Sequence, residues 1–345
     1  MRRLPIFLML DVSESMAGEN RARLDEAIGT IVANLRTDPS ALETVHLSAI
    51  AFAGVVRTLS GLEELSTFRA PALPIGSGTA LGAALHHVMD AIDRDVAHPS
   101  AASKGDWSPI VYLFTDGKPT DAIESARARW KRDYAGHATL IAVAIGRYAD
   151  QAALRALTEH VLVFDDRAPG GFEVFIRWVT ESMTVQSQRL GGGVSLAKPD
   201  DRVLTEAGEP GALVPCDDRD CVVLVGRCQV TRKPYLLKYE RTAIPSELKA
   251  ALPDFDALTL SGAFPITETY FDWSEGTGGG GMISTADIAG VAPCPHCGNA
   301  ATIAQCQCGK LMCAGGPGDA LCPWCGQECI FEAGVAEFEI ERRRG

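Results

Sequence analysis

The sequence has no apolar run long enough to cross a membrane and no excess of basic residues. Its apolar stretches, such as Pro5–Leu10, fall far short of the roughly 18 residues that a membrane-spanning helix needs. Asp and Glu outnumber Lys and Arg by 44 to 32, so the formal net charge is −12, and the parts before and after Leu190 are both acidic. Such a surface disfavours contact with phosphate backbones. We therefore expect neither a membrane nor a nucleic acid among the partners.

The N-terminal residues do not have the pattern of a secretory leader. Met1–Arg3 precedes an apolar run, but the run stops at Asp11 and no small-residue cleavage site follows. We interpret the run as a buried first strand and expect a cytoplasmic protein. The chain has 345 residues, of which 46% are hydrophobic, so it is long enough for two or three globular domains.

Residues 1–190 alternate between strand-length apolar runs and segments with helical spacing. The predicted strands are 4–10, 45–52, 110–114, 140–145 and 161–164, and the helical segments include 24–35, 81–92 and 172–183. Continuous apolar strands are typical of strands buried on both faces. We predict an α/β domain with a doubly wound, largely parallel, Rossmann-like sheet, in which 55–59 forms an antiparallel edge hairpin with the preceding strand.

The pattern changes after Gly191–Gly193, and residues 194–345 have few helix signals. Strands are predicted at Cys221–Gly226, Tyr235–Tyr239 and Thr267–Trp273. Residues 276–281 are rich in glycine and would connect this part flexibly to a cysteine-dense region at 294–329. Residues 331–340 would add a last strand. We therefore predict a small β-rich module that contains a zinc ribbon.

Oxygen-bearing side chains follow several of the predicted strands in the first domain. Asp11 ends the first strand, Ser13 and Ser15 follow it, and Asp116 follows a later strand, while Thr79 opens a predicted helix. The carboxyl ends of parallel strands meet at one edge of a sheet, so these groups are expected to lie near one another. Two carboxylates and three hydroxyls form a hard oxygen site that suits Mg²⁺ or Mn²⁺. Taken singly, each serine would more often be a helix N-cap, and Asp116 before a glycine a turn residue.

In combination these residues resemble the metal-ion-dependent adhesion site of a von Willebrand factor A domain. All five ligand positions of the family pattern are matched, by Asp11, Ser13, Ser15, Thr79 and Asp116. The resemblance implies that the hydroxyls bind the ion directly, that the aspartates act largely through water, and that an Asp or Glu of a protein partner completes the shell. It also implies that the neighbouring Glu14, Met16 and Lys118 shape specificity.

Two cysteine pairs have the spacing of zinc knuckles. They are Cys294 with Cys297 and Cys322 with Cys325, each with proline after the first cysteine and glycine after the second. Such pairs direct both sulfurs at one ion, and together they permit a Cys₄ zinc ribbon. Because a closed Cys₄ shell has no open position, the predicted zinc is structural.

The remaining cysteines leave alternatives open. Those between and after the knuckles would either hold a second zinc or replace one pair in the ribbon: Cys306, Cys308, Cys313 and Cys329. Those in the β-rich part lack knuckle spacing and are predicted to be buried thiols: Cys216, Cys221 and Cys228.

The whole chain resembles the TerY-type proteins of bacterial tellurium-resistance systems. The resemblance rests on the first domain together with Leu224–Cys228, Lys233–Lys238, Cys306–Lys310 and Cys322–Gly326. It implies an accessory protein that works with a protein kinase and a PP2C-type phosphatase in a phosphorylation-linked stress response.

Three functions compete at this point. The first is a non-enzymatic scaffold that binds an acidic side chain through Mg²⁺. The second is a metal-dependent phosphoester hydrolase, which needs a general base that none of the seven histidines supplies beside Asp11 or Asp116. The third is a nucleic-acid-binding zinc-ribbon protein, which the negative charge disfavours. Self-association through the metal stays open as well.

Overall fold

The computed structural model describes most of the chain and divides it into two compact units. The described residues are 2–100, 104–116, 119–145, 149, 151–164, 171–188, 197, 204–206, 221–241, 258–274, 281–331 and 337–342. The first unit comprises residues 1–12, 19–74 and 79–216, and the second comprises 13–18, 75–78 and 217–345. The glycine break at 191–193, Lys118 and Cys216 lie outside the described residues.

A seven-stranded sheet forms the centre of the first unit. Its strands are β1 (Leu4–Asp11), β2 (Val45–Phe52), β3 (Val56–Glu64), β4 (Ile110–Thr115), β5 (Thr139–Ile145), β6 (His160–Phe164) and β7 (Leu204–Glu206). The order is β3-β2-β1-β4-β5-β6-β7, and the five inner strands are parallel. The edge strands β3 and β7 are antiparallel to their neighbours. The predicted α/β class and the antiparallel hairpin after β2 are confirmed.

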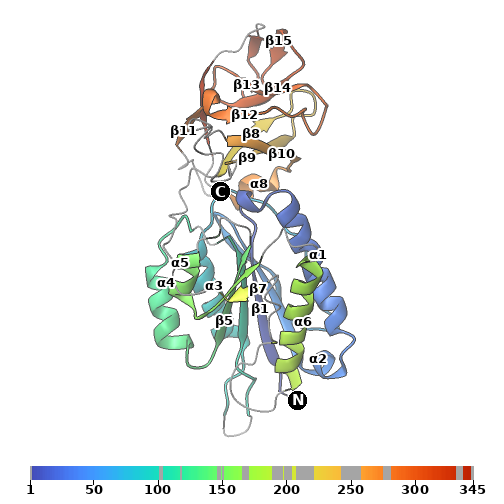
Figure 1. The fold of residues 1–345 in the computed structure, drawn as a ribbon, viewed down its shortest axis with the longest axis vertical. Helices are drawn as coiled ribbons and strands as arrows, with labels where there is room; N and C mark the ends of the chain where they lie inside the picture. Colours follow the sequence, from blue (N-terminus) through green and yellow to red (C-terminus); the bar gives the residue numbers. More distant parts are fainter. Residues whose placement is uncertain are drawn as a thin grey trace, which may run out of the picture. The chain divides into compact units, whose positions relative to one another are not determined.

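Helices cover both faces of this sheet, as Figure 1 shows. The helical segments are α1 (Glu19–Leu35), α2 (Pro39–Thr44), α3 (Leu81–Asp95), α4 (Glu124–Arg129), the π-helix η2 (Trp130–Tyr134), α5 (Gln151–Leu157) and α6 (Gly171–Gln188). Helices α1 and α2 pack with α6 on one face, and α3 packs with α4 on the other. Every residue of β1 is buried, which explains why its sequence is continuously apolar.

An ion pair ties the start of the chain to the segment that precedes β4. Arg3 Nε donates to Asp106 Oδ1 at 2.9 Å, and Arg3 Nη2 donates to Oδ2 at 2.5 Å. The backbone N–H of Ala97 also donates to Oδ2, at 2.7 Å. Burial alone would raise the pKa of Asp106, but the hydrogen bonds from Arg3 and Ala97 and the charge of Arg3 outweigh burial and lower it.

We expect Asp106→Asn to destabilise the first unit in a pH-dependent way. A carboxyl group whose pKa is lowered by folding stabilises the protein above its unfolded pKa and loses this effect as the pH falls through the folded pKa. Denaturant unfolding at pH 7 should show a loss of about 1 to 3 kcal/mol, as for hydrogen bonds to charged groups. The difference from wild type should shrink at a pH well below about 4. Asp133→Asn, at a solvent-exposed pair with Arg132, is the control and should have no measurable effect.

The second unit is built on a six-stranded sheet of order β12-β10-β9-β8-β14-β13. Its strands are β8 (Cys221–Arg227), β9 (Pro234–Arg241), β10 (Leu258–Pro265), β12 (Ile288–Ala289), β13 (Ala301–Gln305) and β14 (Leu311–Ala314). Two further strand pairs are β11 (Met282–Ser284) with β17 (Glu339–Glu341), and β15 (Gly318–Leu321) with β16 (Glu328–Phe331). Among its described residues, the unit also contains the short helices η1 (Glu14–Met16), α8 (Thr269–Trp273) and η3 (Thr285–Asp287).

The structure changes two expectations for this unit. The segment Thr267–Trp273 was predicted to be a strand, but it contains helix α8, whose Tyr270 and Trp273 are buried one helical turn apart. The cysteine-dense region is not a separate ribbon, because its strand β14 pairs with β8 in the main sheet. The last strand was predicted at 331–340, of which residues 332–336 lie outside the described part; residues Glu339–Glu341 form β17, which pairs with β11 in a two-stranded sheet of its own.

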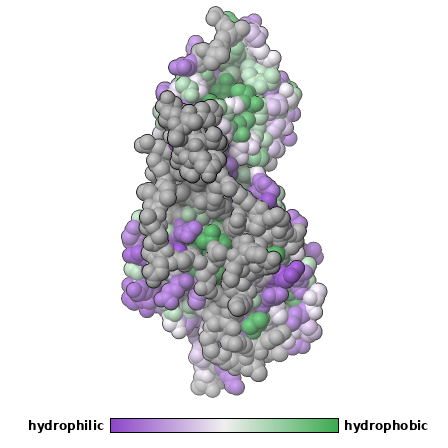
Figure 2. Space-filling model, viewed as in Figure 1, coloured by the Kyte–Doolittle hydropathy of each residue, from purple (hydrophilic) through white to green (hydrophobic). Residues whose placement is uncertain are grey.

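The described surface mixes polar and apolar side chains, as the face drawn in Figure 2 shows. The large apolar residues that are exposed are Leu42, Val230, Met282, Val291, Leu321 and Ile330. Among the described residues, no helix combines the length and the apolar character needed to span a membrane.

Candidate metal centres

Four cysteines of the second unit form a buried cluster, which we call cluster one. Its members are Cys228, Cys294, Cys297 and Cys313, whose sulfurs all lie within 4.8 Å of one another. Three of these cysteines are buried, and they belong to the unit's main hydrophobic core beside Tyr235 and Leu311. Four thiolates at this spacing can hold a tetrahedral metal ion.

A second group of four cysteines, cluster two, is more accessible. Its members are Cys306, Cys308, Cys322 and Cys325, again with all sulfurs within 4.8 Å of one another. Cys306 and Cys322 are buried, whereas Cys308 and Cys325 are exposed. The neighbouring apolar residues are few and include Met312 and Trp324. Cluster two therefore has the ligand set for a second metal ion, at a site that solvent reaches.

The two predicted knuckles contribute to different clusters. Cys294 and Cys297 belong to cluster one, whereas Cys322 and Cys325 belong to cluster two. The prediction that these four residues share one ion is therefore wrong in its grouping. Cys228 was predicted to be an ordinary buried thiol, and it is instead a member of cluster one.

Both knuckles have the same backbone turn, which explains their sequence pattern. In the first, Cys294 N–H donates to Asn299 O and Gly298 N–H donates to Cys294 O. In the second, Cys322 N–H donates to Gln327 O and Gly326 N–H donates to Cys322 O. The glycine of each turn has a positive φ, +78° at Gly298 and +77° at Gly326, which side chains disfavour.

Backbone hydrogen bonds favour the thiolate form of two cysteines in cluster one, although burial still raises the pKa of Cys313 and of Cys297. The backbone N–H of Thr231 donates to Cys228 Sγ at 3.3 Å, and that of Gln229 donates to Cys313 Sγ at 3.2 Å. Burial alone would raise the pKa of Cys228, but hydrogen bonds from Thr231 and from the Val230 backbone outweigh it and lower the pKa to about 6.

The predicted oxygen ligands of the first unit lie at the carboxyl edge of its sheet. Strands β1 and β4 pair in parallel with Leu10 opposite Phe114. Asp11 comes directly after Leu10, and Asp116 comes two residues after Phe114, so both lie at the same end of the paired strands. Thr115 Oγ1 donates to Asp11 Oδ2 at 2.5 Å. Thr79 is held at the same edge, because Ala80 N–H donates to Ala53 O, directly after β2.

The side chain of Thr79 is fully buried, and its hydroxyl oxygen Oγ1 has no hydrogen-bond partner in the described part of the chain. The backbone around it is well bonded, since Thr79 N–H donates to Thr120 Oγ1 at 2.9 Å and Thr120 N–H donates to Thr79 O. A buried hydroxyl without a partner costs about 1 to 3 kcal/mol, so a ligand for this oxygen is expected.

The two predicted serine ligands lie in a short segment that groups with the second unit. Their hydroxyl oxygens are 3.0 Å apart, and Ser13 forms an isolated bridge with Gly76. Glu14 between them is buried and accepts hydrogen bonds from Tyr270 Oη and from Ser77 Oγ. Met16 is buried too. Glu14 and Met16, which were expected to shape specificity, therefore have buried side chains.

Comparison with known protein families accounts for both units. The von Willebrand factor type A domain matches residues 6–168, and the TerY-C metal binding domain matches residues 218–345. The chain is a von Willebrand factor A domain followed by a TerY-C metal-binding domain. All five predicted oxygen ligands fall within the first match, and both cysteine clusters fall within the second.

Several solved structures are similar to about half of the chain. Proximal thread matrix protein 1 from the mussel byssus is 18% identical over 53% of this chain and 48% of its own, with a TM-score of 0.39. The same mussel protein has also been solved with a zinc-occupied MIDAS motif, at 17% identity over 53% of this chain and 48% of its own and a TM-score of 0.37. The ArnB paralog VWA2 from Sulfolobus acidocaldarius is 18% identical over 53% of this chain and 45% of its own, with a TM-score of 0.39. The match thus spans about half the length of each, and no curated protein sequence matches the chain.

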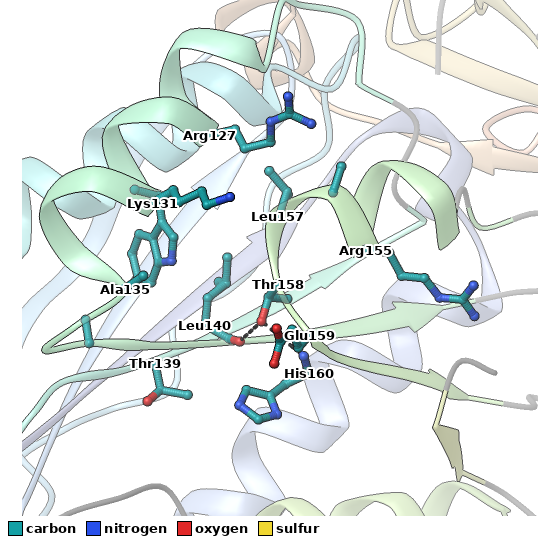
Figure 3. Close-up of a pocket in the computed structure, with 13 residues that line it drawn as sticks. Arg127, Lys131, Ala135, Thr139, Leu140, Arg155, Leu157, Thr158, Glu159 and His160 are labelled. Carbon is teal, nitrogen blue, oxygen red and sulfur yellow. Dashed lines mark hydrogen bonds between the residues drawn. The ribbon is translucent and has the colours of Figure 1, made fainter. Parts of the chain in front are cut away.

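A cavity of about 450 Å³ lies at the opposite edge of the A-domain sheet, where β5 and β6 begin. Figure 3 shows Arg127, Lys131 and Arg155 around it, with Arg155 directed away from Lys131. Thr158 Oγ1 donates to Leu140 O at 2.6 Å in its floor. Because the cations do not converge on one point, we assign this cavity no ligand.

Proposed function

We propose that this protein is a non-enzymatic cytoplasmic scaffold whose A domain binds an acidic side chain of a protein partner through Mg²⁺. The ion would be held by Asp11, Ser13, Ser15, Thr79 and Asp116, and Mn²⁺ would suit the same oxygens. The observation that carries the proposal is the buried Thr79 Oγ1 without a partner. A cation bound there would satisfy this oxygen.

The chemistry of these ligands favours an acidic partner. Three of the five are neutral hydroxyls, and in the family that these residues resemble the two aspartates act largely through water, so the ion would keep part of its positive charge. A further carboxylate supplied by a partner would complete the shell with a charged oxygen, the type of ligand that such hard cations prefer. The bound metal would supply this electrostatic attraction, while the protein positions the oxygens.

The TerY-C domain would hold two Zn²⁺ ions, one in each cysteine cluster. Thiolate ligands in sets of four suit zinc, and a closed tetrahedral shell leaves no position for catalysis. We propose that both ions are structural and that the domain offers a second binding surface. On the strength of the TerY resemblance, we propose a protein kinase and a PP2C-type phosphatase as partners, in a tellurium-resistance type of stress system.

The test is a pair of baits in lysate of the native host with Mg²⁺ present. Wild-type protein should retain a protein kinase or a PP2C-type phosphatase that a Thr79→Val variant loses, as identified by mass spectrometry. A point variant is preferable to a chelator, which would also remove the thiolate-bound metals. If both baits retained the same partners, the metal of the A domain would not be the binding element.

A further inference from the structure

A fifth cysteine contacts cluster two. Cys329 lies in β16, opposite Ala320 of β15, and its Sγ is 3.4 Å from Sγ of Cys306. This distance is shorter than the 3.7 Å between Cys306 and Cys325, which are both members of the cluster. The Cys329 sulfur is not within 4.8 Å of all four cluster-two sulfurs, so Cys329 contacts the ligand set without belonging to it.

A metal in cluster two leaves this thiol uncoordinated. Four thiolates fill the tetrahedral shell of zinc, so Cys329 would stay a free thiol in contact with a ligand. Cys329 is half-buried, and the neighbouring ligands Cys308 and Cys325 are exposed. A small oxidant in solution can therefore reach this group of sulfurs, whereas three of the four cysteines in cluster one are buried.

We propose that Cys329 is an oxidation site that opens cluster two in response to a peroxide. In the first step the sulfur of Cys329 attacks hydrogen peroxide, the O–O bond breaks, and water leaves, so that Cys329 becomes a sulfenic acid. In the second step Cys306 attacks the sulfur of Cys329, the S–S bond forms, and the S–O bond breaks with loss of a second water after protonation. Two thiols are oxidised and one peroxide is reduced.

The two sulfurs are already in contact. A disulfide bond is about 2.05 Å long, so the two sulfurs need to approach by only about 1.4 Å. Because Cys306 would then no longer be a thiolate ligand, the metal of cluster two would keep three ligands and would be released or exchanged. A thiol reductant would restore the four-ligand site. This inference requires a metal in cluster two, but it does not depend on the proposed binding of an acidic partner.

The experiment uses the full-length protein loaded with zinc and treated with hydrogen peroxide. Released zinc is followed with a chromogenic chelator, and the peptides are mapped by mass spectrometry without reduction. Wild-type protein should release one equivalent of zinc and yield a peptide linked through Cys306 and Cys329. Dithiothreitol with added zinc should reverse both changes.

Two variants make the test specific. Cys329→Ser should bind as much zinc as wild type before oxidation and release it roughly tenfold more slowly in peroxide, since the uncoordinated thiol is gone. Cys221→Ser removes another half-buried cysteine outside both clusters and should behave like wild type. Equal release from wild type and Cys329→Ser would overturn the proposal. A peptide map of oxidised wild-type protein that lacks the Cys306–Cys329 link would also overturn it. This second test does not depend on whether a variant folds.

Discussion

Replacing Cys313 with serine should unfold the TerY-C domain and leave the A domain folded. Cys313 is fully buried, belongs to cluster one and packs in the main core of its unit. A structural zinc ion contributes on the order of 10 kcal/mol or more to the folding of a small domain, which is comparable to the whole stability of most domains. Removing one of its four ligands at this site should therefore remove most of the domain's stability.

Calorimetry and limited proteolysis would measure this effect. Wild-type protein should show a thermal transition for each domain, and Cys313→Ser should keep only that of the A domain, with proteolysis confined to residues after 217. Cys221→Ser is the matched control, since Cys221 lies in β8 of the same domain but in neither cluster. An unchanged TerY-C transition in Cys313→Ser would show that cluster one does not stabilise the domain through a metal.

Replacing Thr79 with valine should stabilise the A domain when Mg²⁺ is absent and abolish its response when Mg²⁺ is added. Valine has the shape of threonine without the hydroxyl, and the Thr79 Oγ1 is buried with no partner in the described chain. Removing an unsatisfied buried group relieves a cost of about 1 to 3 kcal/mol. A bound ion stabilises only the protein that binds it, so Mg²⁺ should raise the free energy of unfolding of wild type but not of Thr79→Val.

Denaturant unfolding in magnesium-free buffer and with added Mg²⁺ would test both halves of this prediction. Thr158→Val is the control, because the Thr158 hydroxyl already donates to Leu140 O at 2.6 Å. That variant should lose stability in both buffers and keep the response to Mg²⁺. If Thr79→Val were destabilised in the absence of Mg²⁺ and still responded to the ion, the oxygen would not be a metal ligand.

The sequence predicts the A-domain sheet well because its signals are local. Strands such as β1 and β4 are buried along their whole length, so their sequences are largely continuous apolar runs. Asp11 and Asp116 stand at or just after the ends of such strands, and parallel strands have their carboxyl ends at one edge of the sheet, so the two residues are predicted to lie there.

The grouping of the cysteines was not predictable in the same way, because it depends on a pairing between distant strands. Leu311 lies opposite Gly226 and Met312 opposite Arg227 in the parallel pair of β14 and β8. The next positions in register are Cys313 and Cys228, which brings these cysteines together across more than eighty residues of sequence. Knuckle spacing predicts which residues can bind a metal, but it carries no information on such a pairing.

Helix α8 shows a different limit of sequence interpretation. The segment from Thr267 to Trp273 is rich in threonine and aromatic residues and ends in an apolar–polar–apolar alternation, and both features favour a strand. Its two buried aromatic residues, Tyr270 and Trp273, also satisfy the spacing of one helical turn. In so short a segment the strand period of two and the helical period both fit. The burial of the two aromatic rings on one side favours the helix.

Element-resolved anomalous diffraction from crystals of the full-length protein, grown with zinc and with Mn²⁺ in place of Mg²⁺, tests the metal assignments most directly. We predict one zinc peak among Cys228, Cys294, Cys297 and Cys313, a second zinc peak among Cys306, Cys308, Cys322 and Cys325, and a manganese peak beside Thr79 Oγ1. A single zinc peak shared by the two knuckle pairs, or no manganese beside Thr79, would contradict this account.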